Sequence, residues 1–293
     1  MILSPEEQGG AKDEGPVLLD VGPSRKIMRQ AGKDDTCIEC ISKERSSHGE
    51  AWRSVHGSYF SDPAVARPFV EAIVSSFSIS EPSVIADIGG GDGFMLRELS
   101  ARAKMHFSRL VNVDASQEQL EACHSDLRRV CCSVMELERM QLVDKGTLTL
   151  ISRSVLHYFG RAGQPEFLNK MRALLRPGEA FVHQPACFAT SELAECMNEV
   201  YPLMGVDKTY FTPEELESMH RRAGFEVLSS EWGPPLDLRS EDLAVRYHLN
   251  EEKIEQIIRI IKRHGLDRDG TVEVAPGRFR TPFTYLILTL KAV

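Results

Sequence analysis

The sequence lacks an excess of basic residues, a long apolar run and a dense set of cysteines. Its 293 residues include 35 Lys and Arg against 43 Asp and Glu, which gives a formal net charge of −8. Nucleic acids and anionic membranes are bound by clustered basic faces, so this balance disfavours both partners. No run of about 18 apolar residues occurs, and the N-terminus lacks the basic-then-apolar order of a signal peptide. We therefore expect a cytoplasmic protein with no nucleic-acid or membrane partner.

The cysteines do not indicate a disulfide framework or a metal site. There are seven, an odd and small number for a chain of this length. Cys37 and Cys40 form a single C-x2-C pair, whereas a structural zinc site usually needs two further ligands at matching spacing. Cys131 and Cys132 lie in an apolar run, where we expect a buried strand whose thiols pack as small hydrophobic groups. The sequence predicts no metal.

The hydrophobic content of 42% is enough for one large domain, or for one domain with an insertion. Residues 1–45 are rich in Gly, Pro and charged residues and are predicted to be a flexible tail. The main α/β core is predicted over 46–233, followed by a helical insertion over 234–281 and a final strand over 282–293. The insertion contains an amphipathic stripe of isoleucines, and two roles are open for it, a substrate cap and a dimer contact.

A glycine-rich loop is the most informative stretch. Residues 84–96 read VIADIGGGDGFML, which predicts a buried strand, a tight turn and the start of a helix. A dinucleotide fingerprint has glycine at its sixth position, but counting from Gly89 that position is Phe94. The carboxylate of Asp92 would also repel a phosphate at the helix N-terminus. A dinucleotide cofactor is therefore disfavoured, and an NAD(P)-dependent oxidoreductase is the weaker alternative.

The same loop resembles motif I of the class I S-adenosylmethionine (SAM) methyltransferases. Asp87, Gly89, Gly91 and Gly93 form the acid-x-G-x-G-x-G pattern of that motif, and the resemblance implies that they bind SAM. SAM has no phosphate and carries a positive sulfonium and an amino group, so nearby carboxylates are compatible with it. The implied fold is a Rossmann-like, doubly wound α/β sheet of seven strands in the order 3-2-1-4-5-7-6. Strand 7 would be antiparallel, with helices on both faces.

Asp114 is the second candidate SAM ligand. It ends the next apolar run, 21 residues after Gly93. A carboxylate at the end of a second strand at this spacing accepts hydrogen bonds from ribose hydroxyls. A capping role for Asp114 is the alternative, but Ser116 and Gln119 already form a capping box for the helix predicted over 117–128. We therefore predict that Asp114 binds the ribose.

The third strand departs from the family pattern. Many relatives have an acid there for the adenine amino group, whereas this sequence has Ser133 followed by Val134. We expect backbone groups and packing against Val134 and Met135 to hold the adenine instead. Because of this departure, the alternative is a catalytically inactive protein that binds SAM and serves as a regulator or scaffold.

The segment SRSVLHYF, residues 152–159, resembles the corresponding segment of small-molecule O-methyltransferases. The resemblance makes His157 the general base and places Arg153 beside the methionine part of SAM. A near-neutral pKa suits histidine to this role, with packing as the alternative. Tyr158 departs from the family, which usually has Asp-Trp at this point. His183, at the end of the fifth strand, is the reserve candidate for the base.

These resemblances together imply a SAM-dependent methyltransferase that acts on an oxygen or nitrogen atom of a small-molecule acceptor. The Asn/Asp-Pro-Pro-aromatic signature of enzymes that methylate nucleobase amines does not follow the fourth strand, which further disfavours DNA. Trp52, Tyr59 and Phe60 lie where many relatives have a cover over the cofactor, with hydrophobic anchoring as the alternative. A homodimer is left open.

Helix starts and the last strand complete the predicted outline. Helical patterns begin at Pro63, Pro165 and Thr190, and the alternating apolar pattern of the last strand covers 283–290.

Overall fold

The structure is a computed structural model that describes His56 and residues 58–293. The tail predicted over 1–45, the Cys37 and Cys40 pair and Trp52 lie outside the described residues. Within the described part of the chain, no helix combines the length and the apolar character needed to cross a membrane.

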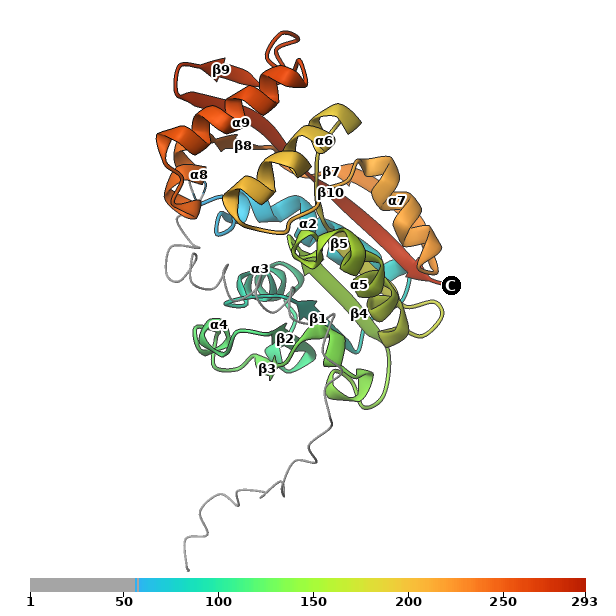
Figure 1. Ribbon diagram of the computed structural model, residues 1–293. Coiled ribbons are helices and arrows are strands. Elements are labelled where there is room, and N and C mark those ends of the chain that lie inside the picture. The colour runs from blue at the N-terminus through green and yellow to red at the C-terminus, as the bar shows by residue number, and fades with distance from the viewer. Residues whose placement is uncertain (1–55, 57) are drawn as a thin grey trace, which may run out of the picture. The chain divides into compact units, whose positions relative to one another are not determined.

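The described residues contain a ten-stranded sheet whose main part runs in the order β3-β2-β1-β4-β5-β10-β7 (Figure 1). Strands β3, β2, β1, β4 and β5 pair in parallel, and β10 is antiparallel to both β5 and β7. The predicted order, with an antiparallel seventh strand, is confirmed. The strands of this main part are β1 (Val84–Ile88), β2 (Leu110–Asp114), β3 (Arg128–Cys131), β4 (Leu148–Arg153), β5 (Ala180–Gln184), β7 (Phe225–Trp232) and β10 (Arg278–Ala292).

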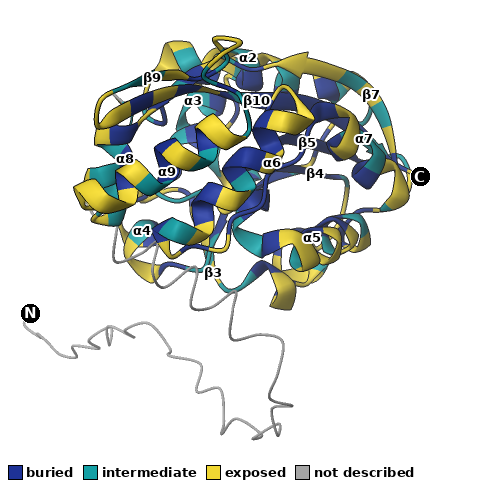
Figure 2. Ribbon diagram, turned by 45° about the horizontal axis from the view of Figure 1, so that its top comes forward, coloured by how far each residue is buried: buried dark blue, intermediate teal, exposed yellow. Residues whose placement is uncertain are grey.

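Helices cover both faces of this sheet because its central strands are apolar on both sides. Side chains alternate along a strand, so Ile85 packs with one layer and Ala86 with the other. The first layer contains α2 (Pro63–Ser75), α3 (Phe94–Ala103) and α4 (Gln117–Glu121), and the second contains α5 (Gly160–Leu174) and α7 (Pro213–Arg222). Figure 2 shows the central strands as buried and the outer side of α5 as largely exposed.

Some predicted elements differ in length. Helix α2 begins as expected, with Asp62 Oδ1 accepting a hydrogen bond from Ala64 N (2.8 Å). Helix α4 ends at Glu121 rather than 128, because His124 Nδ1 accepts from Asp126 N (3.3 Å) and such local bonds compete with a helix. Helix α5 starts at Gly160 and contains Pro165 in its interior.

The prediction of a buried strand at Cys131 and Cys132 is wrong. Cys131 is exposed and Cys132 is half-buried. Among the described strands, β3 pairs with β2 alone and lies at the edge of the sheet, and Arg128 and Arg129 are exposed as well. An apolar run of this length does not distinguish a central strand from an edge strand.

The segment over 234–281 adds a small layer at one end of β10. It contains β8 (Leu236–Arg239), α8 (Ser240–Tyr247), α9 (Glu251–Arg263) and β9 (Glu273–Ala275). Strands β8 and β9 pair with the first part of β10, which is therefore longer than the predicted 283–290 (Figure 1). The isoleucines of α9 pack against α6 (Ser191–Val200) in a separate apolar cluster, and β6 (Ala186–Cys187) pairs with the middle of β10. The roles as a cap or dimer contact stay predictions.

Two histidines form a buried pair between β5 and α7. His183 and His220 have no exposed surface, and His183 Nδ1 lies 2.9 Å from His220 Nε2. The other ring nitrogen of His220, Nδ1, lies 2.7 Å from the backbone oxygen of Leu216, so it carries the proton and Nε2 accepts from His183. Burial lowers the pKa of His220 to about 4 and lowers the pKa of His183 well below its usual value. Both rings are therefore neutral at pH 7.

Because His183 and His220 are buried in the neutral form, we predict that the protein loses stability in acid. An unfolded histidine has a pKa of about 6.5, so below that pH the unfolded chain takes up protons that the folded pair does not. The free energy of unfolding should then fall as the pH drops from 6.5 toward 4, by up to about 1.4 kcal/mol per pH unit for each proton. Urea unfolding across this range measures the slope, which the double variant His183→Phe/His220→Leu should reduce. The exposed control His248→Asn should keep it, and equal slopes in the double variant and the parent would contradict the account.

Candidate functional site

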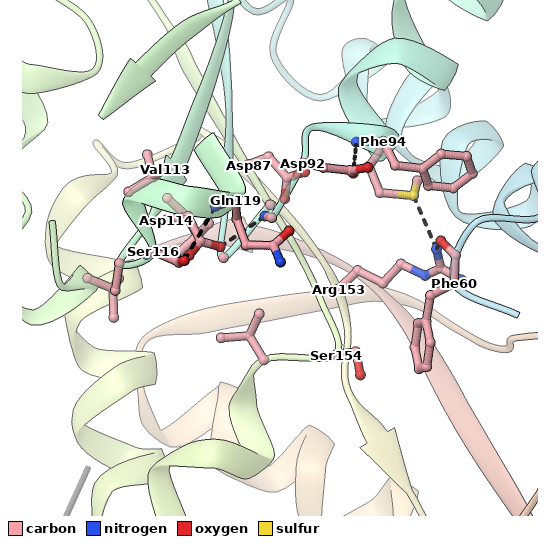
Figure 3. A pocket seen from close by; sticks show the side chains of 18 of the residues that line it. Phe60, Asp87, Asp92, Phe94, Val113, Asp114, Ser116, Gln119, Arg153 and Ser154 are labelled. Atoms are coloured by element: carbon pink, nitrogen blue, oxygen red, sulfur yellow. Dashed lines mark hydrogen bonds between the residues drawn. The ribbon is translucent and has the colours of Figure 1, made fainter. Parts of the chain in front are cut away.

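A cavity of about 550 Å³ opens at the carboxyl ends of β1, β2 and β4 (Figure 3). Its volume is in the range of small-molecule sites. The walls come from the glycine-rich loop, the end of β2, the loop after β3 and the segment after β4. Figure 3 shows Asp114, Ser116 and Gln119 on one side and Arg153 and Phe60 on the other. The ligand-binding edge expected for an open α/β sheet is therefore hollow here.

The glycine-rich loop is tightly fitted to β2. Gly89 N and Gly90 N both donate to Val113 O, at 2.8 and 3.2 Å. Gly89 and Gly91 have positive φ values of 72° and 55°, which glycine adopts without strain. A Cβ atom on Gly90 would lie 2.0 Å from Asn112 Oδ1, so the backbone crosses directly over this buried side chain. The loop needs glycine at 90 for packing, which the motif itself does not indicate.

Asp92 occupies the N-terminus of α3. Its Oδ1 accepts from Phe94 N (3.0 Å), and its Oδ2 lies 3.5 Å from Arg97 Nη2. A carboxylate therefore sits at the helix N-terminus, where a dinucleotide fold would place a phosphate. This geometry supports the exclusion of a dinucleotide.

Asp114 connects the end of β2 to the loop. Its Oδ2 accepts from Gly91 N (2.9 Å) and its Oδ1 from Ser116 N (2.8 Å). Ser116 Oγ caps α4 by accepting from Gln119 N (3.4 Å), as half of the predicted capping box. All four residues line the cavity. A carboxylate in this position can accept hydrogen bonds from a pair of hydroxyl groups.

Asp87 is a buried carboxyl group beneath the loop. It is 1% exposed, and its Oδ2 has no hydrogen-bond partner among the described residues. Burial is the main cause that raises the pKa of Asp87 to about 7, and the charge of Asp114 raises it further, while Arg153 opposes the shift. A cation placed in the cavity next to Asp87 would favour its ionised form.

Arg153 lies across the cavity at the end of β4. Its guanidinium group lies over the rings of Tyr59 and Phe60, 5.7 and 5.6 Å from their centres. Its Nη1 donates to Phe60 O (3.3 Å) and contacts Met95 Sδ (3.5 Å), whereas its Nε has no hydrogen-bond partner within residues 58–293. The arginine therefore holds two of the predicted cover residues and presents a positive charge to the cavity.

The remaining candidates are divided between this cavity and other places. Ser133 and Val134 line it. Gly93 does not line it; its φ is 74°, and a Cβ there would lie 2.8 Å from Leu127. His157 is 5% exposed and lines a smaller neighbouring cavity instead. His183, in the pair described above, lines neither of these cavities.

Several lining residues were not among the predicted ligands. They include Gly90, Ser116, Gln119, Ser154 and Tyr158. The glycine run could have indicated Gly90. The only sequence signals for the other four were their positions in a helix cap or after a strand.

The comparisons with known proteins agree with this geometry. Residues 85–178 match a family model described as a methyltransferase domain. A putative methyltransferase from Bacillus halodurans has a TM-score of 0.60 at 12% identity, covering 77% of this chain and 98% of that one. The YcgJ protein from Bacillus subtilis has a TM-score of 0.55 at 14% identity, with the same coverage of 77% and 98%. A search of curated proteins found no match.

A third solved structure covers more of the chain. It is the 1,6-didemethyltoxoflavin-N1-methyltransferase of Burkholderia thailandensis, with bound 1,6-didemethyltoxoflavin and S-adenosylhomocysteine. Its TM-score is 0.51 at 18% identity, and the match covers 91% of this chain and 93% of that one. The matched domain and the strand order are similar to those of class I SAM-dependent methyltransferases.

The fit between Gly90 and Asn112 can be tested within the loop. Gly90→Ala should lower the free energy of unfolding by about 2 kcal/mol, because the new methyl group overlaps two buried polar side chains and the loop must move. Gly91→Ala is the matched control, since its Cβ meets nothing closer than 3.7 Å and costs only the ~1 kcal/mol of a positive φ. Urea unfolding of both variants measures the difference. A larger loss for Gly91→Ala would refute the packing argument.

Proposed function

We propose that this protein transfers the methyl group of SAM to an oxygen or nitrogen atom of a small-molecule acceptor. The observation that carries the proposal is the pair of buried polar atoms at the cavity, Asp87 Oδ2 and Arg153 Nε, that lack hydrogen-bond partners among the described residues. Leaving buried polar groups unpaired is costly, and the methionine part of SAM carries an amino group and a carboxylate that would satisfy both. When bound, SAM supplies a methyl group activated by its sulfonium charge.

The other walls fit the nucleoside part of the same cofactor. Asp114 would accept hydrogen bonds from the ribose hydroxyls, and the backbone of Gly89 and Gly91, which lines the cavity without a side chain, would let the nucleoside lie close to the chain. Ser133 and Val134 also line the cavity and would hold the adenine. Asp92, which disfavours a pyrophosphate, does not oppose a ligand without phosphate.

The chain contributes to the reaction mainly by orienting the acceptor relative to the methyl group of SAM and by excluding water. An acceptor that must lose a proton also needs a base, and His157 is our candidate because of its place after β4. Its ring lies against Tyr158, with ring centres 4.2 Å apart, and Tyr158 lines the cavity. His183 is the weaker candidate, since the bond to His220 occupies its Nδ1 within the core.

The Burkholderia structure supports both the cofactor and a nitrogen acceptor, because it is named an N1-methyltransferase and its bound molecules are S-adenosylhomocysteine and 1,6-didemethyltoxoflavin. Oxygen remains in the proposal through the resemblance of residues 152–159 to O-methyltransferases. A SAM-binding protein without transfer activity is the alternative function. The cytoplasmic location, the homodimer and the absence of a nucleic-acid partner stay predictions from the sequence.

Titration calorimetry with S-adenosylhomocysteine tests the cofactor. Because the pKa of Asp87 is about 7 in the free protein, an amino group that binds there should displace a proton at pH 6 and bind more tightly as the pH rises to 7. Asp87→Asn should weaken binding about 10- to 100-fold, the expected effect of losing a charge-assisted bond, and remove the proton release. The exposed control Asp126→Asn should bind as the parent does. Binding of NADH without S-adenosylhomocysteine would overturn the proposal.

The role of His157 is tested by turnover with an identified acceptor. If His157 is the base, His157→Gln should lower kcat by about 10²- to 10⁴-fold and remove the rise of kcat with pH, while S-adenosylhomocysteine binding is unchanged. The exposed control His124→Gln should retain the pH profile. Equal turnover and an equal profile in His157→Gln would assign the ring to packing.

A further inference from the structure

Gln184, at the end of β5, carries a buried amide group without a hydrogen-bond partner. Its side chain has no exposed surface, and neither its Oε1 nor its Nε2 is paired with any of the described residues. Burial of an amide without hydrogen bonds destabilises the folded state, and most buried polar groups in proteins are therefore paired. We infer that the partner of this amide is a group that the chain itself does not supply.

The amide lies next to the wall of the larger cavity. Strands β4 and β5 pair with Arg153 opposite Gln184, so the two side chains point to the same face of the sheet. The next residue, Ser154, donates from its backbone N to Gln184 O (2.9 Å). Arg153 and Ser154 both line the larger cavity. Gln184 lines neither that cavity nor the smaller one beside it, which has a volume of about 20 Å³.

The structure leaves space at the amide nitrogen. A Cβ atom on Gly233, the residue after β7, would lie 2.8 Å from Gln184 Nε2 and 3.2 Å from the Cβ of Tyr285. Gly233 is not among the glycines with a positive φ, so the backbone conformation does not require glycine here. The absence of a side chain at 233 therefore serves the space around Gln184.

The wall beside Gln184 contains a strained residue. Ser154 lines both cavities and has a φ of 61°, an uncommon conformation for serine. Its Oγ lies 3.2 Å from Tyr285 Oη. Strain of this kind collects at functional sites, where the surrounding structure maintains it. The strain is independent of the unpaired amide and occurs at the same place.

The chemistry of an amide group limits its partner. The side chain of Gln184 offers an acceptor, Oε1, next to a donor, Nε2. A carboxylate would pair with Nε2 alone, and an ammonium group with Oε1 alone, so either would leave one atom unpaired. A ligand edge that has an N–H beside a C=O pairs with both atoms. Lactams, imides and carboxamides have such an edge.

We propose that Gln184 recognises the methyl acceptor, and that this acceptor carries an amide-type edge, an N–H beside a C=O. The inference rests on the proposed function, because it names the substrate class of that reaction. The N–H of the acceptor donates to Oε1, and its carbonyl oxygen accepts from Nε2. The acceptor reaches Gln184 past Arg153, and the rings of Tyr59 and Phe60, which pack on this guanidinium group, shift to admit it.

Titration calorimetry of protein saturated with S-adenosylhomocysteine tests the acceptor class. 2-Pyridone is the probe with an N–H beside a carbonyl group, and N-methyl-2-pyridone is the matched probe in which a methyl group replaces that hydrogen. Benzoate is the carboxylate probe. The parent protein should bind 2-pyridone about tenfold more tightly than either of the others, as expected for the loss of one buried hydrogen bond.

Variants of Gln184 make the test specific. Gln184→Met and Gln184→Leu remove both polar atoms and should bind the two pyridones equally well, with unchanged affinity for S-adenosylhomocysteine. The exposed control Gln117→Met should behave as the parent. The proposal is overturned if 2-pyridone does not bind, if N-methyl-2-pyridone or benzoate binds equally well, or if the preference survives in the Gln184 variants. Weaker binding of S-adenosylhomocysteine by these variants would also overturn it, because Gln184 would then belong to the cofactor site.

Thermal melts without ligand distinguish an unpaired amide from one that binds a buried water. Removal of an amide without a partner should leave the Tm of the Gln184 variants equal to or above that of the parent, whereas removal of an amide that binds a structural water should lower it. A lower Tm in both variants would therefore contradict the proposal. Saturation with S-adenosylhomocysteine is measured first, so failure there counts against the proposed function and not against the acceptor class.

Discussion

The attachment of the glycine-rich loop to the end of β2 is the interaction on which the rest of the site depends. Val113 O accepts two loop amides, and the carboxylate of Asp114 accepts a third from Gly91. The same carboxylate also caps the turn that leads into α4 through Ser116 N. One strand end therefore fixes the backbone on two sides of the large cavity. Asn112 lies beneath the loop and leaves no room for a side chain at Gly90, so this backbone has little freedom to shift.

Opposite charges are buried near each other in this fixed frame. Asp87 lies beneath the loop and Arg153 lies at the end of β4, and each has an atom without a hydrogen-bond partner in the described structure. Burial shifts the pKa of Asp87 to about 7, so in the empty site the carboxyl group is near its titration point. A ligand with its own separated charges would favour ionised Asp87 and replace water that these groups have lost. The affinity for such a ligand and the release of a proton when it binds therefore both depend on the side chain of Asp87.

The sequence predicted the elements whose signals are local. The loop, its acid at Asp87 and the strand-end Asp114 were found because strand, turn and helix follow each other within a few residues. The sequence did not show that Gly93 lies against Leu127, or that β3 lies at an edge, because each depends on partners distant in the chain. The smaller cavity was not predicted for the same reason. Its polar residues come from separate segments, and the contact of Lys208 with Tyr247 spans 39 positions.

The long strand β10 explains how the two cavities can be built from different parts of the chain. Its second half pairs with β5 and β7 in the main sheet, whereas its first part pairs with β8 and β9. Tyr285 lies between these halves, stacks on Tyr59 and lines the smaller cavity. Leu236, Leu238 and Arg246 reach that cavity from the added segment and contribute nothing to the lining of the larger one. Changes in this segment can therefore alter the smaller cavity while the glycine-rich loop and Asp114 stay as they are.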